Sequence, residues 1–113
     1  MSFSTALSGL AAPNTAMDVV GNNLANLNTT GFKADAIDFK DIMGQTSGAT
    51  EIGAGVATSS TSKQFTQGSI QPTAGALDAA IEGNGVFVLR NAAGSTLYTR
   101  AGSFKFDGTG TLV

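Results

Sequence analysis

The 113-residue sequence has no cysteine, no histidine and no tryptophan, and only 12% of its residues are charged, against about 25% in ordinary globular proteins. The absence of thiols and imidazoles excludes disulfides, cysteine or histidine nucleophiles, and zinc or iron–sulfur sites built from the usual ligands. Serine, threonine, lysine and eight dispersed carboxylates are left to do chemistry. We therefore expect no enzyme activity, no cofactor and no metal site.

Positive charge is also scarce. The six lysine and arginine residues never cluster and the net charge is −2, so no cationic surface is available for nucleic acid. No apolar run reaches the length of a membrane span. Serine, threonine and glycine interrupt residues 1–10, unlike a cleaved signal peptide. We expect partners that are neither nucleic acid nor a lipid bilayer.

Glycine, alanine, serine and threonine supply about half of the chain, and the first pattern among them is an amphipathic helix over residues 3–28. Its large apolar residues recur at steps of three and four, which is typical of one helix face. They form what we call the apolar stripe: Phe3, Leu7, Leu10, Met17, Val20, Leu24 and Leu27. Pro13 cannot donate a backbone hydrogen bond to Gly9 and should kink the helix.

The polar face of this helix carries almost no charge. Asp18 is the one ionised side chain before Lys33, so the helix lacks the ion pairs that a water-exposed face usually carries. The near-heptad spacing of the apolar stripe favours a coiled-coil seam, whereas the alternative is an ordinary helix packed on its own sheet. Glycine and proline make it a poor isolated helix, so we expect partners to order it.

Residues 22–33 combine four asparagines with Gly31, Phe32 and Lys33. One interpretation is a helix end, in which asparagine and threonine satisfy terminal carbonyls and Gly31 takes the left-handed conformation. Another is contact between copies of one uncharged surface, because side-chain amides both donate and accept hydrogen bonds.

Residues 32–71 are predicted to form an extended connecting arm. Most residues from 44 to 64 are Gly, Ser, Thr, Ala or Gln, which is a linker composition. Residues 55–65 could nevertheless extend as a polar edge strand. Residues 34–43 favour one or two helical turns or an extended arm.

Residues 72–113 are predicted to begin an outer domain built as an antiparallel β-meander. Short strand-like segments alternate with turns that contain glycine, asparagine or aspartate. The expected strands are 77–81, 86–90, 97–100, 104–107 and 111–113, which leave the sheet incomplete. With residues 1–31 as a long, partner-dependent helix and its asparagine-rich turn, and with the arm between them, the predicted fold class is α+β.

Two possible ligand sites are set aside. Asp35, Asp38 and Asp41 recur every three residues, but the glycine turn and final glutamate of an EF-hand loop are absent, so a solvated acidic face is expected. Gly83 and Gly85 begin like a dinucleotide-binding fingerprint, but the third glycine and the following helix are missing.

A third possible site consists of two carboxylates. Asp78 and Glu82 share one face of a predicted strand, but no base or aromatic platform accompanies them. We expect Arg100 to form a cross-strand ion pair with one of the two.

Two blocks of the sequence resemble the bacterial flagellar rod and hook proteins. The first is similar to an N-terminal signature of that family through Asn22, Asn23, Asn26, Thr29, Gly31, Phe32 and Lys33. The second is similar to the family's shared β region through Leu77, Asp78, Ile81, Gly83, Gly85, Phe87, Tyr98, Thr99, Arg100, Gly102 and Phe104. Residues 34–63 match weakly. The opening residues are most similar to the hook branch of the family, although Pro13 departs from it.

The resemblance implies a self-assembling structural subunit of the flagellar hook, a curved tube that passes torque from rod to filament. It implies a homo-oligomer with other rod, hook and junction proteins as neighbours, exported through the flagellum's own channel without a cleaved signal peptide. It also implies that the N-terminal helix pairs with a C-terminal helix, and that the 113 residues are the N-terminal portion of a longer chain.

Two alternatives remain open from the sequence. Within the family, the chain could be a distal rod subunit of the basal body. From a different class, an exported β-rich binding or adhesin module would need Phe87, Tyr98 and Phe104 exposed on one face.

Overall fold

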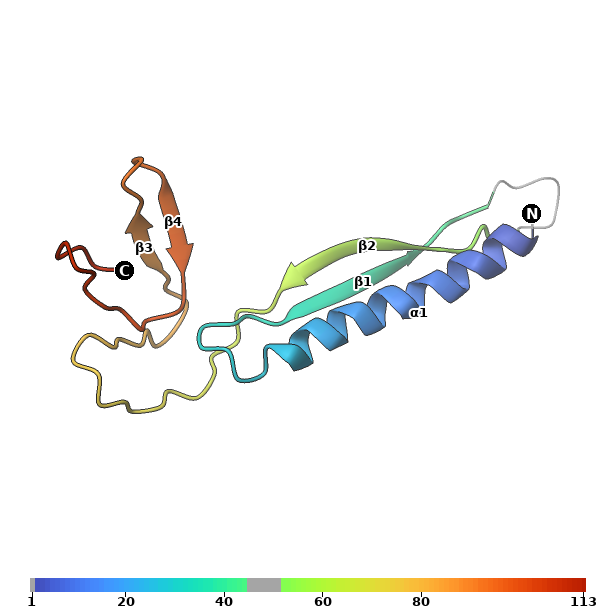
Figure 1. Cartoon of the computed structure of the whole chain (residues 1–113). Coiled ribbons are helices and arrows are strands. Elements are labelled where there is room, and N and C mark those ends of the chain that lie inside the picture. Colours follow the sequence, from blue (N-terminus) through green and yellow to red (C-terminus); the bar gives the residue numbers. More distant parts are fainter. Residues whose placement is uncertain (1, 45–51) are drawn as a thin grey trace. The chain divides into compact units, whose positions relative to one another are not determined.

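The described chain, residues 2–44 and 52–113, folds into one helix and four strands in the computed structural model. In chain order the elements are α1 (Ser2–Ala25), β1 (Asp35–Asp41), β2 (Val56–Lys63), β3 (Phe87–Arg90) and β4 (Thr96–Thr99) (Figure 1). They belong to two compact units. The helix–hairpin unit contains the chain up to Leu27 and Ala34–Gln64, and the β unit contains Asn28–Lys33 and Phe65–Val113.

Helix α1 is one uninterrupted element although Pro13 lies inside it. Proline leaves the carbonyl of Gly9 without its helical donor, and both positions are exposed, so water can serve that carbonyl. At the other end, the backbone N–H and the side-chain Nδ2 of Asn26 both donate to the Asn22 carbonyl, over 3.1 and 2.9 Å. The helix therefore ends at Ala25, earlier than the predicted end at residue 28, and a turn begins at Asn26.

Strands β1 and β2 form an antiparallel hairpin that lies alongside α1 (Figure 1). Asp35 is opposite Lys63, and the two also form an ion pair, with Lys63 Nζ 2.7 Å from Asp35 Oδ1. The register shifts between Asp38 and Phe39, a β-bulge that increases the local twist. Helix α1 thus packs against a hairpin of the same chain.

This hairpin occupies much of the range predicted to be a connecting arm. The prediction of a polar strand within residues 55–65 is confirmed by β2, whereas residues 35–41 form a strand rather than helical turns. Both strands belong to the same unit as α1, not to a linker between units. The physical reason is that a weakly patterned strand gains most of its stability from the strand and helix that it packs against.

The β unit contains a second antiparallel hairpin, β3–β4, in which Phe87 is opposite Thr99. Its turn closes with a hydrogen bond from the Gly94 N–H to the Asn91 carbonyl over 2.8 Å, and Gly94 has the positive φ that tight turns require. The other predicted strands appear only as two isolated bridges, Asp78 with Ser103 and Phe106 with Leu112. The α+β class is confirmed, but a continuous meander is not formed by the described residues.

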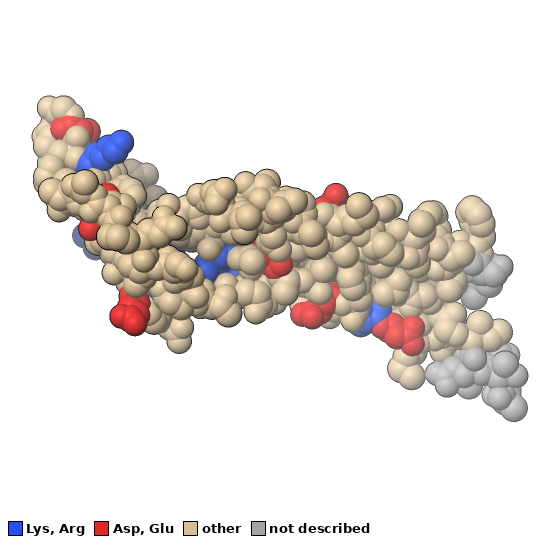
Figure 2. All heavy atoms as spheres, turned by 90° about the horizontal axis from the view of Figure 1, so that it is seen from below, with Lys and Arg blue, Asp and Glu red and all other residues tan. Residues whose placement is uncertain are grey.

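Considering only the described residues, neither unit has a conventional hydrophobic core. Among residues 2–44 and 52–113, no hydrophobic side chain is fully buried, and most large apolar side chains are exposed. The face drawn in Figure 2 is mainly uncharged, with acidic and basic side chains scattered over it. Extended apolar surface of this kind marks a site of interaction with other molecules.

Candidate assembly surface

Helix α1 meets the hairpin through small and polar residues. Along this part of the chain the half-buried positions recur at steps of three and four: Thr5, Ser8, Ala12, Thr15, Ala16, Val19, Asn23 and Asn26. Small side chains allow helix and hairpin backbones to approach closely, and α1 contacts both β1 and β2. The uncharged polar face, for which the sequence predicts contact with protein, is therefore turned to the chain's own hairpin.

The apolar stripe lies on the other side of α1. At about 100° per residue, its positions are centred roughly opposite the hairpin-facing ones. Its exposed fractions are 81% for Phe3, 56% for Leu7, 65% for Leu10, 71% for Met17, 63% for Val20, 70% for Leu24 and 74% for Leu27. The helix does pack on its own sheet, but with the small face, so the large apolar residues are left for another partner.

Two polar side chains of α1 bind the hairpin backbone directly. Asn23 Nδ2 donates to the Asp35 carbonyl over 2.8 Å, and Asn23 Oδ1 accepts from the Asp35 N–H over 2.9 Å. This pair of bonds imitates the pairing of two strands. Near the other end of the helix, Ser8 Oγ accepts from the Val56 N–H over 3.3 Å. These contacts fix the hairpin lengthwise on α1 without using the apolar stripe.

The second half of the N-terminal signature, residues 29–33, folds as a turn of the β unit. Gly31 has φ of 76°, so the predicted left-handed conformation is confirmed, although it lies beyond the helix end. The Phe32 N–H donates to the Thr29 carbonyl over 3.2 Å, and Lys33 Nζ donates to the Thr66 carbonyl over 2.8 Å. Gly31, Phe32 and Lys33 are all half-buried. The signature thus divides between the two units.

Arg100 is bound by uncharged oxygen atoms. Its Nη2 donates to Gln67 Oε1 (2.7 Å), the Ile81 carbonyl (2.8 Å) and the Gly83 carbonyl (2.6 Å), and its Nη1 donates to the Gly85 carbonyl. The Gly83 N–H also donates to Gln67 Oε1, over 3.2 Å. A guanidinium presents several fixed donors in one plane, so one side chain holds the whole loop over residues 81–85.

The predicted ion pair between Arg100 and Asp78 or Glu82 is wrong. Among the described residues, no ion pair joins Arg100 to either carboxylate. Asp78 instead accepts a hydrogen bond from Thr73 Oγ1 over 2.6 Å. The carbonyls of Ile81, Gly83 and Gly85 form what we call the carbonyl cage of Arg100. The sequence did not predict this cage, because an ion pair with a carboxylate is the ordinary expectation for an arginine between strands.

Several other residues of the β-region motif make contacts inside the β unit. Gly102 is buried, and a side chain there would run into the Ala79 carbonyl, while the Ala79 N–H donates to the Gly102 carbonyl over 2.9 Å. Thr99 Oγ1 accepts from the Ala101 N–H over 3.1 Å. The side chain of Ile81 is half-buried, and that of Leu77 is only just exposed.

The three aromatic residues of the β-region motif do not form an exposed platform. Phe87 and Phe104 pack edge to face, with ring centroids 5.2 Å apart and planes at 88°, and both are half-buried. Such a pair stabilises a fold. Tyr98 is exposed, on its own. The arrangement does not meet the requirement of the binding-module alternative.

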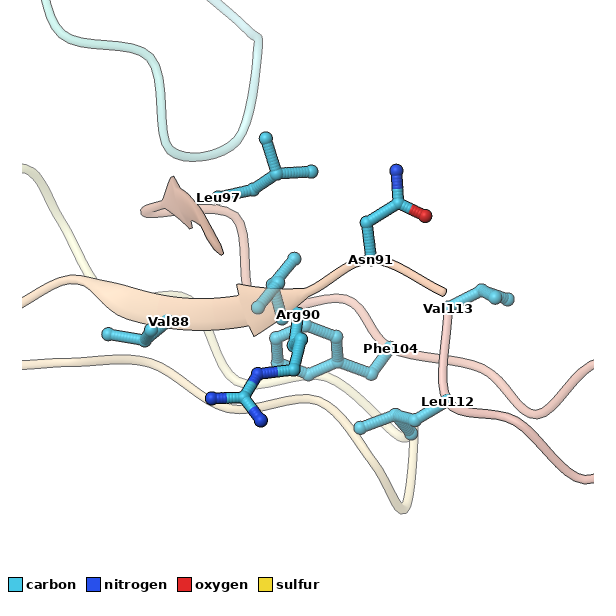
Figure 3. A pocket seen from close by; sticks show the side chains of 8 residues that line it. Val88, Arg90, Asn91, Leu97, Phe104, Leu112 and Val113 are labelled. Atoms are coloured by element: carbon cyan, nitrogen blue, oxygen red, sulfur yellow. The ribbon is translucent and has the colours of Figure 1, made fainter. Parts of the chain in front are cut away.

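A shallow depression of about 390 Å³ lies beside β3 in the β unit, as Figure 3 shows. Its lining residues are Val88, Leu89, Arg90, Asn91, Leu97, Phe104, Leu112 and Val113. Arg90 is the one ionisable side chain among them, so the lining offers no pair of groups for acid–base chemistry.

Metal-ligating groups do not gather elsewhere in the described chain: residues 2–44 and 52–113 contain no cluster of three. Helix α1 is not apolar enough to cross a membrane, and the described residues hold no other helix.

The pKa of Asp107 is lowered, chiefly because the Thr109 hydroxyl donates to its carboxylate, with further help from the backbone N–H groups of Thr111 and Thr109. That carboxylate organises its own turn.

Two ranges of the chain match known protein families. Residues 3–33 match the family of flagella basal body rod proteins, and residues 80–113 match the D1 domain family of the flagellar hook protein FlgE/F/G. Over its whole length the chain is 42% identical to the flagellar hook protein FlgE of Salmonella typhimurium. The chain belongs to the flagellar rod and hook protein family.

Other members of the rod and hook family align equally far. The flagellar hook protein FlgE of Treponema pallidum is 40% identical over 99% of this chain, and so is the flagellar basal-body rod protein FlgG of Bacillus subtilis. The chain spans about a quarter of the hook relatives, 27%, and about half of the rod relative, 47%.

The two family matches fall on the features described above. The rod-protein match encloses the apolar stripe and ends at Lys33, the last signature residue. The hook-protein match covers the carbonyl cage of Arg100 and the Phe87–Phe104 pair. The hairpin β1–β2 lies between the two matched ranges, as the weak resemblance of residues 34–63 predicts.

Proposed function

We propose that this chain serves as a self-assembling structural subunit of the bacterial flagellar hook. Its role is mechanical: many copies pack side by side into a tube, together with neighbouring rod, hook and junction proteins. The observation that carries the proposal is the orientation of α1, which is fixed on its own hairpin and still leaves the entire apolar stripe exposed.

Burial of this stripe supplies a driving force for assembly. Fully burying one leucine or phenylalanine side chain contributes about 1.5–3 kcal/mol. Seven such residues therefore supply on the order of 10 kcal/mol, before the entropy lost on association is subtracted. The scarcity of charge has the same logic, since Asp18 is the one ionised side chain of α1 whose desolvation could oppose assembly.

A rod subunit of the basal body is the second candidate, favoured by the match of residues 3–33 to the rod proteins and by the 40% identity to a rod protein. Both roles use an exposed helix stripe. Either role places the chain in the flagellum, reached through the flagellar export apparatus, and neither requires a cofactor or catalysis.

Electron microscopy of purified hook–basal bodies decides between the candidates. The chain contains no cysteine, so a cysteine at the exposed residue Asn91 can be labelled with gold in a complemented strain. Label along the hook supports the proposal, and label confined to the rod selects the second candidate. Motile cells whose hooks and rods carry no label would exclude both.

A further inference from the structure

Four segments that lie far apart in the sequence meet inside the β unit. They are residues 31–33, 66–67, 81–85 and 100–101. At Gly31 an added Cβ would lie 2.5 Å from the Ala101 backbone nitrogen and 2.7 Å from the Arg100 carbonyl carbon. Such distances are closer than any side chain tolerates, so the backbones touch because residue 31 is glycine. We call these four segments the anchor cluster.

Hydrogen bonds join the remaining parts of the anchor cluster. Lys33 Nζ donates to the Thr66 carbonyl. Gln67, which follows Thr66, accepts through its Oε1 from both Arg100 Nη2 and the Gly83 N–H. Arg100 connects the segments. Its guanidinium binds the loop 81–85 and Gln67, and its own backbone lies in close contact with Gly31. Bonds from a charged donor are roughly twice as strong as neutral ones.

The anchor cluster lies next to the places where the chain passes between the two units. These passages are at residues 27–28, 33–34 and 64–65. Lys33 borders the second passage, and its partner Thr66 follows the third after one residue. The turn that follows α1 therefore belongs to the β unit and is held by it.

We propose that Gly31 and Arg100 are positioning residues that anchor the Thr29–Lys33 turn to the β unit. This turn is the second half of the N-terminal signature. Its role is to fix the point at which the chain leaves the β unit. The inference goes beyond the proposed function, because it concerns the single chain and holds whether or not the chain assembles.

Amide hydrogen exchange of the full chain, measured by NMR, tests the role of Gly31. Gly31→Ala combines an unfavourable φ with a backbone clash, so exchange of the Phe32 and Gly83 amides should accelerate on the order of 10- to 100-fold. The matched control is Gly110→Ala, which has a similar positive φ of 82° but no atom within 4 Å of the added methyl group. The control should change only the turn around Asp107. Equal effects of the two variants, or an unchanged Gly83 amide in Gly31→Ala, would overturn the proposal.

Chemical rescue tests Arg100 and remains informative if Gly31→Ala unfolds the β unit. Arg100→Ala should accelerate exchange of the same amides, and millimolar guanidinium should restore their protection by occupying the vacated carbonyl cage, whereas urea at equal concentration should not. Lys33→Met should give a smaller acceleration, about three- to tenfold, with Lys105→Met as the exposed control. An Arg100→Ala chain whose residues 29–33 exchange as in the wild type would show that Arg100 anchors nothing.

Discussion

The helix–hairpin unit leaves the whole apolar stripe exposed, whereas the β unit packs two aromatic rings together and surrounds its central arginine with carbonyl oxygens. In the first unit, small residues and side-chain amides make the internal contacts, and Leu24 remains 70% exposed. In the second, Phe87 packs on Phe104 and Arg100 binds a cage of carbonyls. Under the proposed function, the first unit supplies the apolar stripe for assembly, while these internal contacts stabilise the second unit.

The largest expected effect comes from placing a charge in the apolar stripe. Leu24→Lys should abolish assembly, because burying an unpaired charge between subunits costs several kcal/mol. Export of the subunit should remain, since the hairpin-facing side of α1 is untouched. Electron microscopy of flagella, together with blotting of the exported fraction, measures both results.

The matched control for this variant is Ala11→Lys, at an exposed position of the same helix outside the stripe. It should interfere less with assembly. Normal hooks in the Leu24→Lys strain would show that the apolar stripe is not a packing surface.

The next effect probes the opposite face of the helix. Ala16→Leu enlarges a half-buried residue that faces the hairpin, and overpacking of this kind costs about 1–3 kcal/mol. Thermal unfolding of the monomer, followed by circular dichroism, should therefore shift to lower temperature. Ala6→Leu, the same change at an exposed position, should leave the unfolding temperature nearly unchanged. If the two variants unfold alike, the assignment of inner and outer faces is incorrect.

A smaller loss is expected for the amide that binds β1. Asn23→Ala removes two hydrogen bonds to the backbone of Asp35, worth about 1–2 kcal/mol together. Asn14→Ala is the control, because it gives the same gain in helix propensity at an exposed position. Urea unfolding of the two variants should differ by about that amount, and identical midpoints would remove Asn23 from the contacts that hold the hairpin.

The smallest effect belongs to the β unit alone. The folded pKa of Asp107 lies below the ordinary value of 3.8, chiefly because the Thr109 hydroxyl donates to its carboxylate. A carboxylate with a lowered pKa contributes stability above pH 3.8, which is lost as the pH falls through the folded value. An NMR titration should place its midpoint below 3.8, and Thr109→Val should move the midpoint upward. An unmoved midpoint in the variant would assign the lowering to other donors.

Sequence spacing was sufficient for the outward face of α1 and insufficient for its inward face. Large residues such as Leu10 and Leu24 reveal a stripe by themselves, because helical periodicity is a local property. Small residues such as Ala12 and Ala16 recur just as regularly, but they indicate burial only once a partner is known. That partner is a hairpin whose two strands are separated along the chain and weakly patterned, so local rules predicted an arm.

The site residues of the β unit show the same limit. The sequence identifies Arg100 and the glycines around it as a motif, and it correctly predicts positive φ for Gly31. It does not reveal that the carbonyls of Ile81, Gly83 and Gly85 point at the guanidinium. That direction depends on how the loop turns in three dimensions, which no spacing rule encodes.

The central claim is that copies of this chain bury the apolar stripe of α1 against one another. Leu24→Cys, in a chain that otherwise lacks cysteine, allows maleimide labelling of the stripe in monomers, in purified hook–basal bodies, and in the same material after acid dissociation. The account predicts rapid labelling of the monomer, strong protection in the assembled structure and recovery after dissociation. Equal labelling rates in the monomer and in the assembled structure would contradict it.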